Sequence, residues 1–132
     1  MTRKEILTIA RILLSVLESE SEEFTVLFTD DKEIRSLNNE FRNKDKATDV
    51  LSFPLDDGVY IGDIAISVQT ARRQATQYGV KLRQEILRLL IHGILHLKGY
   101  EHEGVSKTES QRMRRKEKQL YGVISNKWPK RF

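Results

Sequence analysis

The chain has 132 residues, which is enough for one domain and too few for two, so we expect a single domain spanning residues 1–132. Its composition, 39% hydrophobic and 32% charged, is typical of a globular protein and excludes a disordered or membrane-spanning chain. Cysteine is absent, which excludes disulfides and thiolate ligands, so any metal must be held by nitrogen and oxygen atoms.

The net charge of +4 is unevenly divided along the chain. Residues 1–69 contain eight Lys or Arg and fourteen Asp or Glu, whereas residues 70–132 contain fifteen and five, so the halves carry −6 and +10. A basic half attracts polyanions such as nucleic acid. On charge alone, a solvated charged surface explains the pattern equally well.

The first half of the chain alternates helix and strand patterns. Apolar residues recur at helical spacing within residues 1–20 and no signal-peptide cleavage site follows, which indicates an amphipathic helix of a cytoplasmic protein. The β-branched and aromatic run 24–29 predicts a strand. Asp30 is a suitable N-cap for a helix over residues 30–42, with Ile34, Leu37 and Phe41 on one face.

Two apolar runs, 49–53 and 63–67, flank a turn-rich stretch and predict two strands joined by a loop or hairpin. Ser67 is a suitable cap for a helix that ends at Gly79.

Residues 81–97 are apolar on nearly all sides, which predicts a central, buried helix ended by Gly99. A last helix, mostly charged, is expected from Ser106 to about Tyr121. No uninterrupted apolar run approaches the length of a membrane span, so we expect no membrane association.

All three histidines of the chain lie in the stretch HGILHLKGYEH, residues 92–102. His92 and His96 are four residues apart on the predicted helix, so their imidazoles can converge on one ion. Gly99 tolerates a sharp turn that brings His102 back to the same point. We therefore predict one metal ion per chain, zinc first because imidazole suits it, with nickel and other transition metals open as alternatives.

Three ligands leave the fourth position of a zinc ion open, which favours catalysis over a purely structural site. In a peptidase with this histidine spacing, the residue after the first histidine is the glutamate that accepts a proton from water. Gly93 stands at that position. Glu101 and Glu103 flank His102 and are candidate bases. They fit solvated carboxylates of a loop at least as well. Glu85 fits a salt bridge or a contact with a ligand of the metal.

The chain resembles the YbeY-type bacterial endoribonucleases, which act in ribosomal RNA maturation. The resemblance rests on the histidine stretch HGILHLKGYEH, on RNKDKATDVLSFP at residues 42–54 and on GDIAIS at residues 62–67. With the predicted elements, it implies an α+β fold with a small mixed β-sheet covered by helices in a zincin-like layout.

The resemblance also implies site residues and a substrate. His92, His96 and His102 would bind zinc, and Arg42 would be important for activity on RNA, because a guanidinium binds phosphate with two parallel hydrogen bonds. Asp45 and Asp49 would orient the loop after Arg42 or contact the ligands of the metal. The implied activity is single-strand-specific cleavage of ribosomal RNA, including the 3′ end of 16S RNA, and ribosome quality control, with the ribosome or its small subunit as partner.

The chain departs from the family pattern in two places. Family members usually have a short strand before the first helix, so we expect a sheet with one strand fewer here. Glu101 replaces the family's usual aspartate, and we retain it beside Arg42 as a candidate catalytic residue. Two other functions stay open, a zincin-type peptidase and a ribosome-associated RNA-binding factor with a structural metal.

Overall fold

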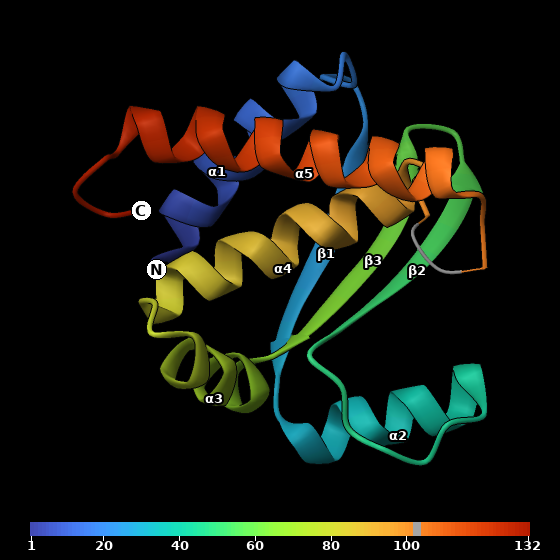
Figure 1. Cartoon of the computed structure of the whole chain (residues 1–132). Helices are drawn as coiled ribbons and strands as arrows, with labels where there is room; N and C mark the ends of the chain where they lie inside the picture. Colours follow the sequence, from blue (N-terminus) through green and yellow to red (C-terminus); the bar gives the residue numbers. More distant parts are fainter. Residues whose placement is uncertain (102–103) are drawn as a thin grey trace.

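The order of helices and strands agrees with the prediction. The structure, a computed structural model, describes residues 1–101 and 104–132. Its elements are α1 (Arg3–Val16), β1 (Glu23–Thr29), α2 (Asp31–Arg42), β2 (Val50–Asp57), β3 (Tyr60–Ser67), α3 (Val68–Tyr78), α4 (Leu82–Leu97) and α5 (Lys107–Lys127) (Figure 1). The last helix runs past the predicted end at Tyr121, because Leu120 and Ile124 both pack into the core.

The sheet is mixed and its strand order is β1-β3-β2. The central strand β3 pairs in parallel with β1 and in antiparallel fashion with β2. With helices packed beside this small sheet, the fold is α+β, which confirms the predicted class (Figure 1). Among the helices in the described residues, none is long and apolar enough to span a membrane.

The hairpin of β2 and β3 is longer than the two predicted runs, because both strands continue through the turn-rich stretch. Pro54 is tolerated because β2 is an edge strand. Ser67 N–H donates to Asp49 O, so the backbone groups of residues 49, 51 and 53 face β3 and those of residues 50, 52 and 54 face outward. The nitrogen of Pro54 therefore lacks no bond to β3. Gly62 is required at its place, because its φ is +136° and an added Cβ would collide with the carbonyl oxygen of Phe53.

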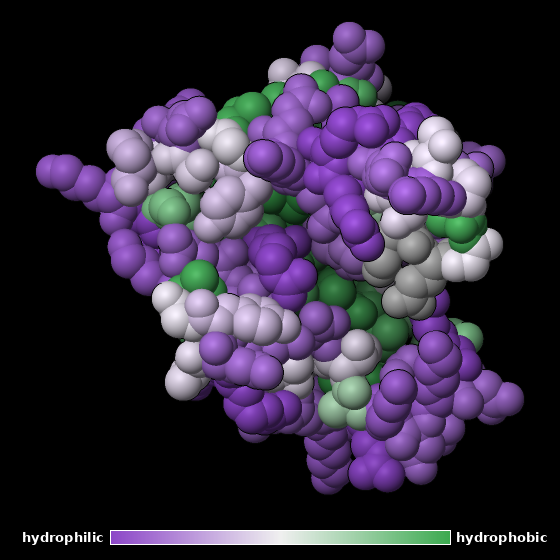
Figure 2. Space-filling view, viewed as in Figure 1, coloured by the Kyte–Doolittle hydropathy of each residue, from purple (hydrophilic) through white to green (hydrophobic). Residues whose placement is uncertain are grey.

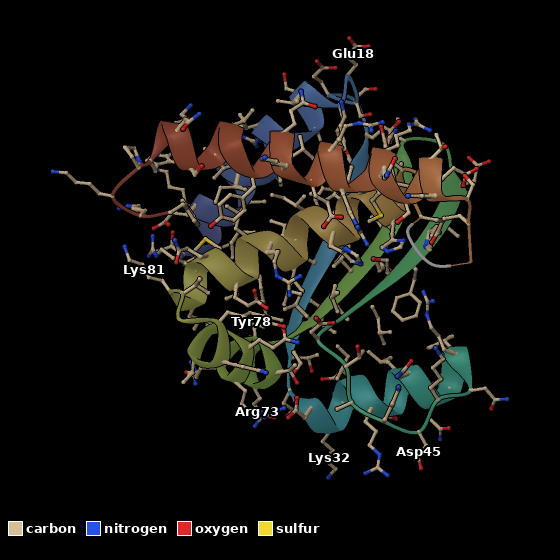
Figure 3. All side chains as sticks on the ribbon, in the orientation of Figure 1. Glu18, Lys32, Asp45, Arg73, Tyr78 and Lys81 are labelled. Atoms are coloured by element: carbon tan, nitrogen blue, oxygen red, sulfur yellow. The ribbon has the colours of Figure 1, made fainter. Side chains whose placement is uncertain are left out.

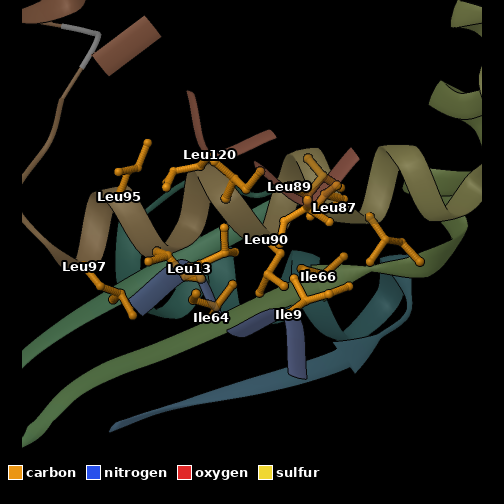
Figure 4. Close-up of a cluster of buried hydrophobic side chains, with 14 of the residues drawn as sticks. Ile9, Leu13, Ile64, Ile66, Leu87, Leu89, Leu90, Leu95, Leu97 and Leu120 are labelled. Atoms are coloured by element: carbon orange, nitrogen blue, oxygen red, sulfur yellow. The ribbon is translucent and has the colours of Figure 1, made fainter. Parts of the chain in front are cut away.

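Helix α4 is the centre of the core, as its sequence predicts. It contacts β2 and β3 on one side and α3 and α5 on the others, so apolar residues are buried around most of its circumference. Figure 4 shows side chains of α4 meeting residues of α1, β3 and α5. The labelled residues are Ile9, Leu13, Ile64, Ile66, Leu87, Leu89, Leu90, Leu95, Leu97 and Leu120. Each such side chain contributes roughly 1.5–3 kcal/mol by leaving water, so α4 is a rigid base for residues on its remaining face.

A polar cluster fixes α2 against α3. The carboxylate of Asp31 accepts hydrogen bonds of 2.6 Å from the hydroxyls of both Ser67 and Thr70 and one of 2.8 Å from Arg73. Figure 3 shows Arg73 extending from α3 toward the start of α2. These contacts, the Ser67 hydroxyl first, lower the pKa of Asp31 from 3.8 to about 2. The start of α2 is thereby held in place, and its far end carries Arg42.

Candidate functional site

His92 and His96 lie one turn apart near the end of α4, with their rings on the same side of the helix. Their Nε2 atoms are 3.0 Å apart, and the ring planes meet at 72°. Each side chain is 20% exposed, so both rings are partly open to solvent. The structure therefore brings together two of the three predicted metal ligands.

A carboxylate faces the other nitrogen of each ring. His92 Nδ1 lies 3.5 Å from an oxygen of Glu117 on α5, and His96 Nδ1 lies 3.3 Å from an oxygen of Glu101. A carboxylate favours a proton on the nitrogen that faces it, so these partners assign the Nδ1–H tautomer to both rings. The Nε2 lone pairs of both rings then point into the same space.

Two facing lone pairs repel at this distance unless a proton or a cation lies between them. Nitrogens bound to one zinc ion at about 2.0–2.1 Å in tetrahedral geometry lie roughly 3.3 Å apart, close to the 3.0 Å observed between the two Nε2 atoms. Ligating histidines usually donate their second N–H to a carboxylate or carbonyl, as the partners of His92 and His96 allow. The pair therefore fits a zinc ion.

The third predicted ligand, His102, lies outside the described residues, as does Glu103. Within residues 1–101 and 104–132, no group of three His, Asp or Glu side chains is arranged to hold a metal. Gly99, which was expected to allow the turn toward His102, has φ of +88° directly after α4. The predicted turn is thus present, while the position of the third ligand stays a prediction.

Packing explains why a glycine follows His92. A Cβ at Gly93 would lie 2.8 Å from Cγ2 and 3.0 Å from Cδ1 of Ile64, which is fully buried in β3. The Gly93 carbonyl also accepts a hydrogen bond of 3.3 Å from the hydroxyl of Ser52 in β2. Helix α4 thus lies close against the sheet at this residue, and a glutamate side chain has no room there.

Arg42 and Glu101 lie at the same cleft as the two histidines. The cleft has a volume of about 150 Å³ and is lined by Arg42, Val50, Leu51, Ser52, Pro54, His92, His96 and Glu101. Figure 2 shows a depression on this face between α4 and α2, with hydrophobic residues visible inside a hydrophilic rim. Arg42 Nη2 donates a hydrogen bond of 2.5 Å to Ser52 O, an outward carbonyl of the edge strand β2. Larger cavities elsewhere on the protein contain neither histidine.

The loop after α2 is held by its own polar contacts. Asn38, which is buried, donates a hydrogen bond of 2.9 Å to the carbonyl of Lys46. Asp45, which points outward in Figure 3, pairs with Arg35 at 2.9 Å, and this hydrogen bond lowers the pKa of Asp45. Asp49 accepts a hydrogen bond of 2.8 Å from the N–H of Val50. Both aspartates therefore orient the loop, which is the first of the two roles expected for them.

Helix α5, which supplies Glu117, also carries exposed basic side chains. Because Glu117 faces His92, the exposed Arg114, one turn earlier on α5, lies on the side of the helix that is near the site. The guanidinium carbon of Arg112 lies 4.6 Å from the ring centre of Tyr100. The indole of Trp128 packs against the core, which supports a structural role for it.

Sequence reasoning missed Glu117. The signal was present, since Glu117 is the single carboxylate in a segment that also contains Arg112, Arg114, Arg115, Lys116 and Lys118. Glu85, by contrast, forms the predicted salt bridge: it is buried, and both of its carboxylate oxygens accept hydrogen bonds of 2.7 Å from Arg88. It does not belong to the cleft.

Comparisons with known proteins agree on one family. The family model of endoribonuclease YbeY matches residues 2–125. The chain is 46% identical over 108 residues to an endoribonuclease YbeY of a Sulfurihydrogenibium species, covering 78% of this chain and 71% of that protein. For the protein of the same name from Persephonella marina the identity is 43% over 119 residues, covering 86% and 77%. The solution structure of a Thermotoga maritima protein superposes with a TM-score of 0.74 at 29% identity, covering 97% of this chain and 84% of that one.

Proposed function

The chain belongs to the YbeY endoribonuclease family, and from this premise we propose that it is a metal-dependent, single-strand-specific endoribonuclease that acts on ribosomal RNA in the cytoplasm. The observation that carries the proposal is the convergence of the Nε2 atoms of His92 and His96 in one cleft with Arg42. Imidazole nitrogens can hold a metal ion and a guanidinium can stabilise the charge of a phosphoryl transition state, so the two together suit metal-assisted cleavage of a phosphodiester.

In this proposal His92, His96 and His102 hold one zinc ion, and nickel or another divalent transition metal is an alternative occupant of the same nitrogens. A bound zinc ion supplies Lewis acidity and favours ionisation of water near neutral pH. Glu117 and Glu101 keep the two described rings turned with Nε2 toward the cleft, through the contacts at Nδ1. Without those carboxylates the rings are free to choose the other tautomer.

Arg42 would bind the scissile phosphate. Its guanidinium has further N–H donors besides the one that bonds Ser52 O, so the contact with β2 holds the side chain at the cleft while other donors remain for a phosphate. In the transition state of phosphoryl transfer the equatorial oxygens gain charge, and a positioned guanidinium stabilises it. This role is that of a catalytic residue.

Glu101 has a second role in the proposal, as acceptor of a proton from the attacking nucleophile. Its side chain is 51% exposed and lines the cleft beside His96. A carboxylate at such a position can orient the imidazole and also accept a proton.

Two observations disfavour a peptidase. Gly93 supplies no carboxylate and its packing on Ile64 admits none. An extended peptide can bind by adding as a strand to an open sheet edge, but on β2 the outward carbonyl of Ser52 is already bonded to Arg42.

A ribosome-associated RNA-binding factor with a structural metal would share the family, the basic α5 and the histidines, so only activity separates it from the nuclease. We further propose that the substrate is the 3′ end of 16S RNA and that the partner is the small ribosomal subunit. The support for both is the family resemblance.

The proposal is tested with protein purified without metal-affinity steps. Cleavage of a single-stranded RNA should disappear with a chelator, return with added zinc, and be much slower on the same sequence in a duplex. A protein that binds the RNA with a full complement of metal but does not cut it would instead be the binding factor.

A further inference from the structure

The most exposed large apolar side chain of the described residues lies next to Arg42. Along the apolar face of α2, Ile34 is fully buried and Leu37 is half-buried, whereas Phe41 is 61% exposed. The predicted buried face therefore ends before Phe41. The ring of Phe41 packs on the ring of Phe53 on β2, with centroids 5.4 Å apart and planes at 66°. Rings at this angle do not stack, so Phe41 keeps aromatic surface open to solvent.

The aromatic pair is close to the phosphate-binding group of the cleft. The guanidinium carbon of Arg42 lies 5.9 Å from the ring centre of Phe53. Residues Ser52 and Pro54, on either side of Phe53, line the cleft itself. The pair therefore lies beside the stretch of β2 that lines the cleft, and Arg42, which bonds Ser52 O, lies between the two.

Positively charged residues follow Phe41 along the chain. Lys44 and Lys46 are exposed in the loop that follows Arg42, and the acid between them, Asp45, is already paired with Arg35. The left-handed residue Asn43 ends α2, so Phe41 and Arg42 both sit on the rigid last turn of a helix. A fixed aromatic ring among cations is the arrangement that proteins use to bind a base together with its phosphates in a single strand.

We propose that Phe41 and Phe53 form a stacking subsite for one unpaired nucleobase of the RNA strand, adjacent to the phosphate held by Arg42. The inference rests on the proposed function and extends it to the source of single-strand specificity. In a duplex the bases are stacked within the helix and shielded, so only an unpaired base can lie on Phe41. Aromatic stacking does not depend on base identity, so the subsite distinguishes single-stranded from duplex RNA but does not distinguish one base sequence from another.

The experiment compares the full-length protein with Phe41→Leu, Phe41→Tyr and Leu7→Ala. Leucine keeps an apolar side chain without an aromatic face, and tyrosine restores the face. Leu7 is a matched control because it is 50% exposed and lies on α1, a helix that packs against α5. Equilibrium affinity and single-turnover cleavage are measured on a short single-stranded RNA that the protein binds, and on versions with one abasic nucleotide at each position in turn.

The expected result is a loss of about tenfold in affinity for Phe41→Leu, with Phe41→Tyr and Leu7→Ala close to the unmutated protein. One abasic position should weaken binding of the unmutated protein by a similar factor and add nothing to Phe41→Leu. An abasic penalty that is the same in both proteins, or unchanged affinity of Phe41→Leu, would overturn the subsite.

The two readouts separate this inference from the proposed function. If the unmutated protein binds the RNA but does not cut it, the nuclease is contradicted and the affinity comparison still decides the subsite. If cutting depends on metal but Phe41→Leu matches the unmutated protein on both readouts, the nuclease stands and the subsite is wrong. Equal losses for Phe41→Leu and Phe41→Tyr with an unchanged abasic penalty would make the pair a packing contact.

Discussion

The Nε2 atoms of His92 and His96 lie 3.0 Å apart, while the Nδ1 atoms of the same rings face two different carboxylates. In each ring, therefore, one nitrogen faces a carboxylate and the other faces the cleft. Helix α5 and the segment after α4 each supply one carboxylate, so two separate parts of the chain orient the pair. Each carboxylate favours the tautomer whose Nε2 lone pair faces the cleft.

We predict that His96→Ala loses the bound metal. Removing one of the three proposed nitrogen ligands would leave too few for tight zinc binding, so the metal content found by elemental analysis should fall from about one ion per chain to a small fraction. As a control for folding, the helix content of His96→Ala by circular dichroism should equal that of the unmutated protein from which the metal has been removed with a chelator. Full metal stoichiometry in a folded His96→Ala protein would remove His96 from the ligand set.

We predict that Glu117→Gln weakens metal affinity by roughly 10- to 100-fold, because outer carboxylates that orient ligating histidines have effects of this size. Saturating metal should restore most of its cleavage rate. Glu101→Gln should stay slow even at saturating metal if its carboxylate also accepts a proton. Competition with a chelator gives the affinity, and the same cleavage rate for both variants at saturating metal would argue against a separate role for Glu101.

The elements and their order were predictable because each has a local signal. Asp30, Ser67 and Ser106 cap the helices that they were expected to cap, and each accepts a hydrogen bond from the backbone three residues later. The extension of β2 through Pro54 was not predictable, since only the pairing with β3 shows that the nitrogen of this proline faces outward. Tertiary pairing overrode the local turn signal there.

From spacing alone, the site was predictable only where its residues are near one another in sequence, whereas Arg42 was predicted from the family resemblance and does line the same cleft. His92 and His96 lie on one helix, so their spacing is sufficient to bring them together. Glu117 reaches His92 from another helix, and the bond from Arg42 to Ser52 O depends on how α2 crosses the edge of the sheet. Those contacts follow from packing between elements, which hydrophobic periodicity does not determine.

We predict opposite stability effects for two glycine-to-alanine changes. Gly122→Ala on α5 meets no atom within 4 Å, so the protein should gain about 0.5–1 kcal/mol from helix propensity. Gly93→Ala gains the same propensity but presses on Ile64, and overpacking costs roughly 1–3 kcal/mol, so a net loss near 1 kcal/mol is expected.

Urea titrations of both proteins measure the difference. Gly93→Ala should lower the free energy of unfolding by less when Ile64→Ala is already present, because the two residues are in contact. Stabilisation by Gly93→Ala in the unmutated background would show that packing does not require glycine beside His92.

We predict that the basic face of α5 contributes to RNA affinity. Neutralising Arg114 and Arg115, both exposed, should lower affinity and reduce the slope of log affinity against log salt by about one for each phosphate that the protein no longer neutralises. Neutralising Lys4 and Arg11, which are exposed on α1, is the matched control for net charge. Equal salt slopes for the two double variants would remove this part of α5 from the binding surface.

The catalytic assignment of Arg42 is the central claim, and single-turnover cleavage by Arg42→Lys tests it most directly. Lysine keeps the charge but loses the planar two-pronged contact with phosphate. With metal content matched and RNA affinity measured in parallel, we predict a fall in rate of roughly a hundredfold to a thousandfold and a much smaller loss of affinity. An equal, small loss in both quantities would contradict the account and make Arg42 one phosphate contact among several.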